Sequence, residues 1–428
     1  MKAISYAVAV ALVGGVTSAN NEDPAEKPLP STEKSIAEEV ALEDGETEGL
    51  IPSAYTTLFK NQNTEMVWGG RMYLDAGFFT ADSSYVDDNS GIGGDGAEFR
   101  TARLFVKGTI YDSVEFKLQN EFDPNRENNL KDAFIAMTTP VGKIKVGHFK
   151  EPFSIEQLTS SRFITFMERS LGDVFAPSRN IGLQVSGYDE EFGDLNWAAG
   201  VFRNSIDGGP AIGEGQYSYT GRLTATAFNE EDSSSVLHYG GAISFRSDRR
   251  GRNTLTDEPE IHLLLTLGGF LFQPSSGAMM YNLEAAWVDG PVSLQGEYFA
   301  STTEATGQDI EGTGYYVMGS YFLTGEKRNY QAKGGKFARV QVRDNYDGGG
   351  GSGAVELKGR ISSRDFDAAA AVLPTAFPGN ELTNYSLGLN WYLNPNTRIM
   401  FDYIHSEYES GATDDSLDGI MVRFQVDF

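Results

Sequence analysis

Hydrophobic and polar residues alternate with a period of two along most of the chain from Met66 onward. In the clearest run, residues 113–123, apolar side chains alternate with charged and amide side chains. Similar runs occupy residues 102–110, 222–227, 237–245 and 355–361. Such alternation is typical of a β-strand with one apolar and one polar face. About 16 runs can be counted, an even number as in bacterial β-barrels, with roughly 23 residues for each strand and its connection.

Alternation of apolar and polar residues is also typical of a soluble β-sandwich, in which one face of each sheet is exposed to solvent. The lengths of the connections favour a membrane barrel instead, because short turns on one rim and long loops on the other are typical of such barrels. The tight connections are 111–112, 140–142, 289–291 and 394–396. The long connections are 81–96, 150–177, 246–279 and 363–380.

Aromatic residues and the carboxy terminus favour the same architecture. Several aromatic residues lie near the ends of apolar faces, where the interfacial girdles of a membrane barrel would place them. They are Trp68, Tyr219, Tyr239, Trp287, Tyr298, Trp391 and Tyr403. The chain ends in an alternating strand, residues 420–428, that stops on Phe428, as in outer-membrane proteins. We therefore predict an all-β fold, a transmembrane antiparallel β-barrel of about 16 strands.

The amino-terminal residues differ in pattern from the rest. Residues 1–19 read as a signal peptide, with Lys2, an apolar stretch at 3–16 and a small-residue cleavage site. Residues 20–65 carry 11 acidic and 3 basic side chains and are predicted to form a flexible periplasmic leader, with a helical turn or two at 35–42. Residues 66–428 are then the barrel domain, and the predicted location is the outer membrane.

Composition narrows the possible functions. The formal net charge of −26 argues against a nucleic-acid partner, because phosphates would be repelled. The absence of cysteine excludes disulfides and cysteine nucleophiles, and the four histidines are scattered. The motifs of serine hydrolases, zinc proteases and P-loop enzymes are absent. We therefore expect no enzyme activity, no cofactor and no metal site.

Several sequence blocks resemble a known family. The most specific are 147–156, 158–161 and 165–170, which contain Gly-His-Phe-Lys-Glu-Pro-Phe-Ser-Ile-Glu, Leu-Thr-Ser-Ser and Thr-Phe-Met-Glu-Arg-Ser. Further blocks are 99–104, 130–134, 175–180, 290–298 and 323–326. Together they resemble the phosphate-selective porin O and P family over nearly all of the chain after Met66. The resemblance implies a trimeric, 16-stranded outer-membrane porin, whose inward-folded loops form a narrow basic channel for small anions.

The block at 150–177 supplies the first candidate pore residues. It is rich in apolar and charged groups and would narrow a wide barrel if it folded into the lumen. Lys150 and Arg162 match basic positions of the family's loop, and Arg169 follows them. An alternative is that Arg169 forms salt bridges that pin the loop to the wall, together with Glu151, Glu156 and Glu168.

Other basic residues extend the candidate pathway. Arginine suits oxyanions because its planar fork donates two parallel hydrogen bonds. A cluster in the next long loop is similar in kind to the family's arginine series and contains Arg246, Arg249, Arg250 and Arg252. Arg71, Arg103 and Arg222 of the wall continue the pathway, or else form ordinary salt bridges with Asp75, Glu98 or Glu121.

Two segments depart from the simple barrel pattern. Residues 324–353 form a long connection on the rim of short turns, with basic residues that include Lys327, Arg328, Lys333 and Lys336. They either line the pore exit, as a turn does in the family, or form a mobile basic loop. Residues 261–272 are apolar without a clear register, and are either a loop packed in the lumen or an extra strand.

The predicted function is passive diffusion of small anions, with phosphate or polyphosphate as candidate solutes. The alternatives are a general or organic-solute porin without phosphate preference, and a non-conducting barrel with a structural role. Arg100-Thr101 stands where the family has paired arginines, and the barrel region is itself acidic, which counts against phosphate preference. Charges far from the lumen are screened within about 8 Å at physiological ionic strength, so local arrangement should decide. The expected partners are small anionic solutes, outer-membrane lipid and further copies in a homotrimer.

Overall fold

A computed structural model describes the barrel and the elements inside it. The described residues are 56–81, 94–122, 129–203, 205, 217–228, 235–247, 253–257, 260–264, 268–272, 275–305, 308–367, 381–410 and 413–428. The predicted signal peptide, the predicted helical turn at 35–42 and most of the predicted leader lie outside these ranges. No helix in the described ranges is long and apolar enough to cross a membrane.

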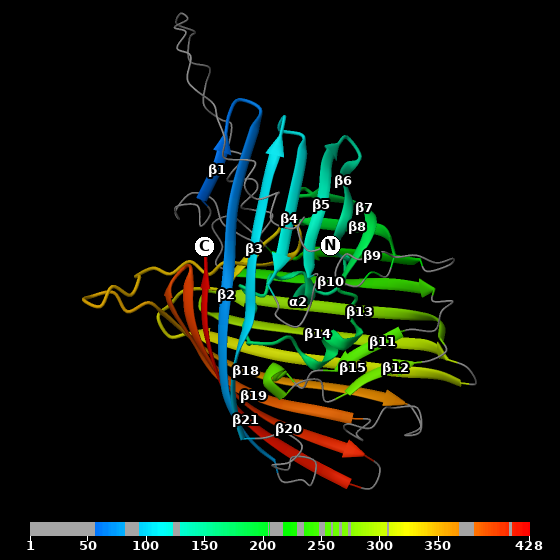
Figure 1. The fold of residues 1–428 in the computed structure, drawn as a ribbon, viewed down its shortest axis with the longest axis vertical. Helices are drawn as coiled ribbons and strands as arrows, with labels where there is room; N and C mark the ends of the chain where they lie inside the picture. The colour runs from blue at the N-terminus through cyan, green and yellow to red at the C-terminus, as the bar shows by residue number, and fades with distance from the viewer. Residues whose placement is uncertain are drawn as a thin grey trace, which may run out of the picture. The chain divides into compact units, whose positions relative to one another are not determined.

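Sixteen strands form one closed antiparallel barrel (Figure 1). Each strand pairs with the next one along the chain, and β21 pairs with β2 to close the sheet. The strands are β2 (Thr64–Ala81), β3 (Gly94–Ile110), β4 (Val114–Glu121), β5 (Leu130–Thr139), β6 (Gly142–Lys150), β7 (Arg179–Asp189), β8 (Leu195–Arg203), β9 (Ser218–Thr226), β10 (Ser235–Ser247), β13 (Ser275–Asp289), β14 (Val292–Ala305), β15 (Gln308–Phe322), β18 (Ala354–Asp367), β19 (Glu381–Asn394), β20 (Thr397–Ser410) and β21 (Thr413–Asp427). The predicted all-β barrel is confirmed.

The two ends of the barrel meet at Phe428. Its main-chain oxygen accepts a hydrogen bond from Gly70 (2.7 Å), and its main-chain nitrogen donates one to the Gly70 oxygen (3.1 Å). Its ring meets Trp68 edge to face, with centroids 5.6 Å apart. The carboxy-terminal strand therefore closes the sheet, which leaves no unpaired edge within the membrane.

Strand β1 (Thr56–Lys60) pairs with the first residues of β2. Both β1 and the start of β2 at Thr64 lie within the range that the sequence assigned to the leader. Thr64 and Glu65 are polar, so alternation does not reveal them as strand residues. The pairing with β3, which joins Thr64 to Ile110, places them in the barrel wall.

The strands carry polar side chains inside and apolar side chains outside. On β18, Glu356, Lys358 and Arg360 are at most 4% exposed, whereas Leu357 and Ile361 are 42% and 46% exposed. This is the reverse of a soluble sheet and matches a barrel whose outer face meets lipid. The predicted girdle aromatics that are more than 40% exposed are Tyr219, Tyr239, Tyr298 and Tyr403.

Most connections are short on one rim and long on the other, as predicted, but the connections at 306–307 and 411–412 on the second rim have only two residues each. Turns at 111–113, 140–141, 290–291 and 395–396 lie on one rim, which also holds Phe428. The connection between β15 and β18 breaks the rule, because it carries a hairpin of two short strands on this rim. They are β16 (Asn329–Gln331) and β17 (Lys336–Ala338), called the inner hairpin below.

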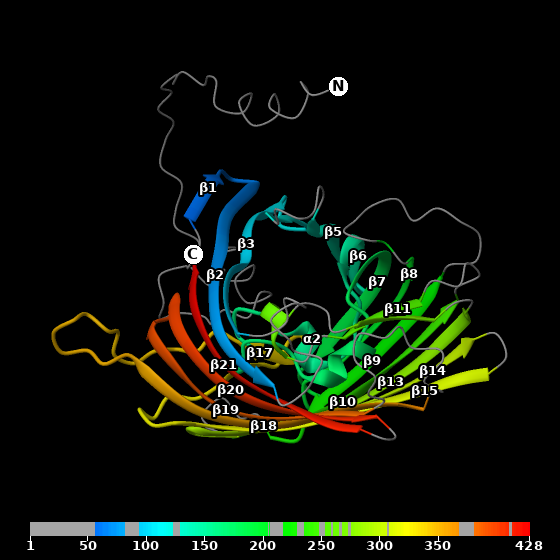
Figure 2. The same ribbon diagram turned by 60° about the horizontal axis from the view of Figure 1, so that its bottom comes forward.

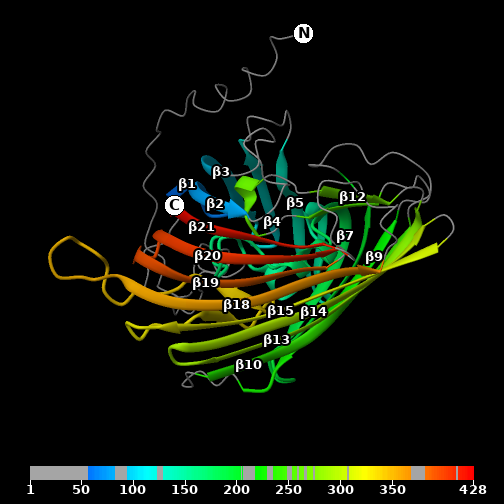
Figure 3. The same cartoon turned by 90° about the horizontal axis from the view of Figure 1, so that it is seen from below.

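Several elements lie within the ring of strands (Figures 2 and 3). The connection from β6 to β7, residues 151–178, is called the inner loop and contains α2 (Ile155–Leu158) and η1 (Leu171–Phe175). The connection from β10 to β13 contains β11 (Asn253–Asp257), η2 (His262–Leu264) and β12 (Gly268–Phe272), with β11 and β12 paired. The sequence predicts residues 261–272 to be either a loop packed in the lumen or an extra strand. Ile261 is buried among inward-facing residues, as in the first interpretation, and residues 268–272 form a strand, as in the second.

Candidate functional site: a cation-lined constriction

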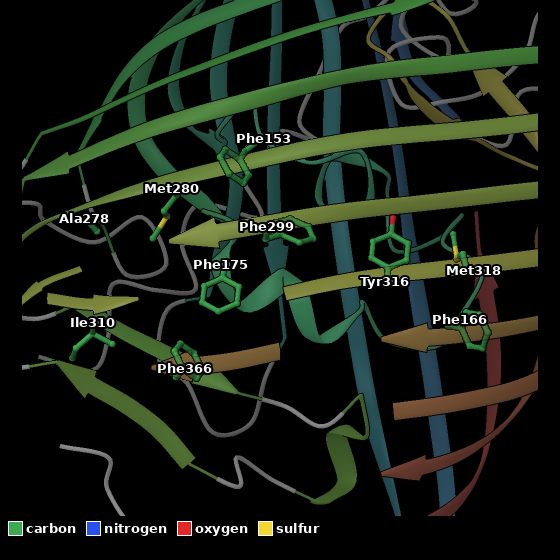
Figure 4. Packing of buried hydrophobic residues seen from close by; sticks show 10 residues of the cluster. All are labelled: Phe153, Phe166, Phe175, Ala278, Met280, Phe299, Ile310, Tyr316, Met318 and Phe366. Carbon is green, nitrogen blue, oxygen red and sulfur yellow. The ribbon is translucent and has the colours of Figure 1, made fainter. Parts of the chain in front are cut away.

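The inner loop spans the lumen. It leaves the wall at β6, and its apolar side chains pack against β13, β14, β15 and β18. Counted from β2, β6 is the fifth barrel strand and β15 the twelfth, so the two lie nearly opposite each other. Figure 4 shows the contact, in which Phe153, Phe166 and Phe175 of the loop meet buried wall residues that include Phe299 and Tyr316. The loop therefore divides the lumen and narrows it.

Glycines on β15 make room for the loop. A Cβ added at Gly312 would lie 2.5 Å from the ring of Phe175, and one at Gly314 would lie 2.9 Å from the main chain of Gly172. Real Cβ atoms do not approach other atoms so closely. The small residues at these two positions are thus required for the loop to dock against the wall.

Three glutamates of the loop bind cations of the wall. Glu168 accepts two hydrogen bonds from Arg100 (2.8 and 2.9 Å) and one from Arg423 (2.6 Å). Burial disfavours the charged form of Glu168, but the charges of Arg100 and Arg423 outweigh this and hold its pKa far below its usual range. Glu156 forms an ion pair with Arg360. These contacts form the pinning arrangement that the sequence offered as the alternative for the glutamates.

The third loop glutamate fixes a candidate pathway residue. Glu151 is fully buried and forms an ion pair with Arg246 of β10 (3.1 Å). It also accepts hydrogen bonds from Asn180 and Thr220. The charge of Arg246 is therefore balanced by a carboxylate at the point where the loop leaves the wall.

Lys150 and Arg169 are held in a different way. The Arg169 guanidinium donates hydrogen bonds to the main-chain oxygens of Glu156 in α2 (3.1 Å) and of Thr159 just after it (3.1 Å). The Lys150 ammonium donates to the main-chain oxygens of Gln157 and Thr159. Carbonyl oxygens orient both side chains, and no carboxylate in the described part of the chain accepts a hydrogen bond from either of them.

These two residues belong to a larger cation cluster. It is formed by Arg71, Arg103, Lys117, Lys150, Arg169 and Arg179, from β2, β3, β4, β6, the inner loop and β7. Lys150 interacts electrostatically with Arg169 and Arg179, and Arg103 with Arg71 and Arg179. Among the described residues, the carboxylates of Glu121, Asp132 and Asp173 interact with the cluster. The site defined by these nine side chains carries more positive than negative charge.

The carboxylates are shared among the cations of the wall. Asp132 binds both Lys117 (3.2 Å) and Arg179 (2.6 Å), and Glu121 binds Arg103. Arg71 donates to the hydroxyl of Ser161 at 2.8 Å, which is a neutral partner. The wall facing the inner loop thus presents arginine and lysine groups that are only partly neutralised.

The other predicted pathway residues lie elsewhere. Arg162 is 4% exposed and forms an ion pair with Asp427 (3.6 Å), while Arg222 binds Glu284. Arg249, Arg250 and Arg252 lie outside the described residues.

The predicted exit residues fall into two groups. Lys327 and Lys333 are exposed and Lys336 is half-buried, at or near the inner hairpin. Arg328 is buried, donates to Gln295 (2.9 Å) and lies over the ring of Phe337. Within the described ranges, no group of three or more histidine and acidic side chains is arranged to hold a metal ion.

Sequence reasoning missed Lys117 and Arg179. Lys117 was visible as part of the polar face of the 113–123 run, and Arg179 as part of the block at 175–180. What the sequence lacked was the pairing of both residues with Asp132, which lies on a third strand.

Comparisons with known proteins agree with this architecture. The family model described as phosphate-selective porin O and P matches residues 68–428. Porin O of Pseudomonas aeruginosa is 28% identical over 401 residues, covering 84% of this chain and 87% of that protein. The anion-selective porin of Comamonas acidovorans superposes with a TM-score of 0.53 at 14% identity, covering 85% of this chain and 100% of that one. The trimer form of OmpT, an outer membrane protein of Vibrio cholerae, superposes with a TM-score of 0.50 at 12% identity, covering the same shares.

Proposed function

Because the chain belongs to the phosphate-selective porin O and P family, we propose that it is an anion-preferring porin that passes small inorganic anions, phosphate among them. Membership of this family makes it an outer-membrane channel. The proposal concerns the selectivity of this channel and the residues that produce it.

The observation that carries the proposal is the positive charge of the cation cluster beside the inner loop. Lys150 and Arg169 are oriented by carbonyl oxygens, so they can attract an anion without first breaking an ion pair. Two unit charges 4 Å apart interact by about 4 kcal/mol at an effective dielectric constant of 20. Several such cations in sequence attract an anion and still release it, as conduction requires.

The proposed pathway has two parts. Arg71, Arg103, Lys150 and Arg169, with Lys117 and Arg179, form the constriction, and Lys327, Lys333 and Lys336 line the exit. Arg162, Arg222 and Arg246 lie outside the cation cluster and pair with Asp427, Glu284 and Glu151, so we assign them to the support of the inner elements. The description of the family and the name of the anion-selective porin from Comamonas acidovorans support anion transport, and the trimer form of OmpT supports a homotrimer.

Ion selectivity of the reconstituted channel tests the proposal. In planar bilayers under a salt gradient, we expect the reversal potential to report preference for chloride over potassium. Lys150→Glu should move the reversal potential towards cation preference, because it places a carboxylate in the constriction. Lys60→Glu is the matched control, since Lys60 lies on β1 and is exposed. Cation preference in the parent channel, or equal reversal potentials in the parent and Lys150→Glu, would contradict the proposal.

Phosphate preference needs its own measurement. Addition of phosphate at constant ionic strength should reduce the chloride current at low concentration if the cluster holds oxyanions by bidentate hydrogen bonds. A chloride current that is insensitive to phosphate would identify an anion channel without phosphate preference.

We also propose that residues 1–19 are removed on export and that residues 20–55 lie on the periplasmic side. The apolar stretch at 3–16 and the acidic composition after it support this division. Amino-terminal sequencing of the protein purified from outer membranes should begin near Asn20, and a start at Met1 would contradict it.

A further inference from the structure

The inner hairpin is fixed to one side of the barrel wall by polar contacts. Asn196 of β8 donates to the main-chain oxygen of Ala332 (2.8 Å) and accepts from the main-chain nitrogen of Gly334 (2.7 Å). Arg222 of β9 donates to the main-chain oxygens of Gly334 (3.3 Å) and Gly335 (2.7 Å). Two neighbouring wall strands therefore hold the turn of the hairpin.

A buried carboxylate supports this attachment. Glu284 of β13 is 4% exposed and accepts hydrogen bonds from Arg222 (3.0 Å) and from His238 of β10 (3.1 Å). The other ring nitrogen of His238 lies 2.7 Å from the hydroxyl of Tyr330 in β16. Glu284 thus orients two side chains that each bind the hairpin, one at its turn and one on its first strand.

The second strand of the hairpin, β17, contacts the inner loop. The main-chain nitrogen of Phe337 donates to the Thr159 hydroxyl (3.2 Å). The Phe337 side chain is buried in one cluster with Ile155 of α2, and with Val236 and Val288 of the wall. The hairpin therefore lies between the wall and the part of the loop that holds the two carbonyl-bound cations.

Thr159 connects the hairpin to those cations. Its hydroxyl donates to the main-chain oxygen of Ile155 (2.7 Å) and accepts from Phe337. Its main-chain oxygen accepts hydrogen bonds from Lys150 (3.4 Å) and Arg169 (3.1 Å). A displacement of the hairpin would therefore move an oxygen that orients both cations.

We propose that Arg222, His238 and Glu284 are positioning residues, which hold the inner hairpin beneath the inner loop and so set the positions of Lys150 and Arg169. Arg222 acts by holding the hairpin and not by contacting the permeating anion, because its guanidinium already binds Glu284 and two carbonyl oxygens. The inference rests on the proposed anion pathway only where ion selectivity is measured. Single-channel conductance depends on the width of the pore, so it detects a displaced hairpin whether or not the channel prefers anions.

Substitution Glu284→Gln tests the attachment. It removes the charge that pairs with buried Arg222 and weakens the contact with His238, which favours release of the hairpin. We expect single-channel conductance to rise and the chloride-to-potassium permeability ratio to fall, each by roughly twofold, since pore width and lining charge set both quantities. Glu98→Gln is the matched control, because this substitution also removes a lumenal carboxylate. Glu98 pairs with His262 near the other rim and does not contact the hairpin. We expect this control to keep the parent conductance.

A reversible cross-link separates loss of attachment from general damage to the barrel. A Cβ at Gly335 would lie 2.7 Å from the Thr224 hydroxyl oxygen, so Thr224→Cys with Gly335→Cys brings two thiols close together when the hairpin is docked, with residue 335 in the left-handed conformation that Gly335 adopts (φ 56°). The chain has no cysteine of its own, so no other disulfide can form within it. In the Glu284→Gln background, oxidation of the cysteine pair should restore the conductance and the permeability ratio of the parent channel. Reduction of the disulfide in the same bilayer should return both quantities to the values of Glu284→Gln.

Thr159→Val tests the second step of the coupling. It keeps the shape of the side chain and removes the hydroxyl that accepts from Phe337. We expect a lower permeability ratio with unchanged electrophoretic mobility of the folded barrel.

The outcomes separate the two proposals. Unchanged conductance in Glu284→Gln would overturn the positioning role. A parent channel without anion preference would overturn the proposed function, and the change in conductance would then still report whether the hairpin is held by Glu284.

Discussion

Asp132 illustrates how single residues set the charge of the constriction. Its carboxylate forms ion pairs with Lys117 and Arg179 and interacts with Lys150. It therefore offsets part of the positive charge that these residues would otherwise present to the pore. A carboxylate and a permeating oxyanion are alike in charge and hydrogen-bonding geometry. In the proposed pathway, Asp132 would therefore compete with the anion and keep the cation cluster from trapping it.

Replacing Asp132 with Asn should raise the preference for anions. The substitution keeps the size of the side chain and adds one net positive charge to the constriction, so the chloride-to-potassium permeability ratio should rise. Reversal potentials in a salt gradient measure this ratio. Asp418→Asn makes the same charge change in a half-exposed residue that contacts Tyr403 and His405, and it serves as the control. A lower ratio in Asp132→Asn than in the parent would contradict the role assigned to Asp132.

Glu168 gives a prediction about pH. Its pKa is lowered in the folded protein, so its stabilising contribution is fully present above its unfolded value of about 4.3 and is lost only as pH falls towards the folded value. We therefore expect the inner loop to stay docked, and single-channel conductance to stay near its neutral value, down to about pH 4.

The comparison for this prediction is Glu168→Gln. This variant cannot form the ion pairs with Arg100 and Arg423, so we expect a higher conductance at pH 7 as well as at pH 4. The prediction fails if the parent channel at pH 4 already conducts like the variant.

At the scale of elements, the inner loop depends on packing as much as on charge. Its helix α2 has four residues, which is too short to be stable alone, so contacts with the wall must hold its conformation. Phe153, Phe166 and Phe175 supply those contacts, and Gly312 leaves the space that the ring of Phe175 fills.

Substitution Gly312→Ala should loosen the docked loop. The new methyl group would lie 2.5 Å from the ring of Phe175, and overpacking of this kind costs about 1–3 kcal/mol. We expect a barrel that still folds but shows higher conductance and faster proteolysis within the inner loop. Gly359→Ala is the control, because its added Cβ would meet Leu387 at an ordinary 3.4 Å. Equal protease resistance in the two variants would show that the loop does not need this space.

At the scale of the molecule, charge is segregated. The chain has a net charge of −26, yet six cations gather at the constriction and three loop glutamates bind cations of the wall. Total charge is therefore a poor guide to the selectivity of the pore. Distance from the lumen and screening by salt decide which charges an ion in the pore experiences.

Salt concentration should change the selectivity. The Debye length falls from about 10 Å at 0.1 M salt to about 3 Å at 1 M. Cations of the cluster that an ion passes without direct contact should then contribute less, and the chloride-to-potassium permeability ratio should fall. Reversal potentials at a fixed concentration ratio, measured at low and high mean concentration of KCl, check this. A ratio that stays constant would indicate selection by direct contact alone.

The sequence by itself determined the architecture. Alternation along each strand, short turns on one rim and the terminal strand ending at Phe428 are local features, and in a membrane they permit only a closed sheet. The same alternation assigned Arg71, Arg103 and Arg222 to the lumenal face, and the block at 147–156 identified the connection that folds inward. The start of β2 at Thr64 was missed because its first residues are polar.

Only the tertiary structure decided which lumenal cations have a carboxylate hydrogen-bond partner among the residues that the structure describes and which bind carbonyl oxygens instead. Arg222 and Arg246 bind Glu284 and Glu151, which are 62 and 95 positions away in the chain, whereas Lys150 and Arg169 bind carbonyl oxygens of the inner loop. These pairings depend on how the loop crosses the lumen and packs against strands nearly opposite its origin. A charge acts on a passing ion according to its distance and its partner, and neither quantity is encoded in a local pattern of residues.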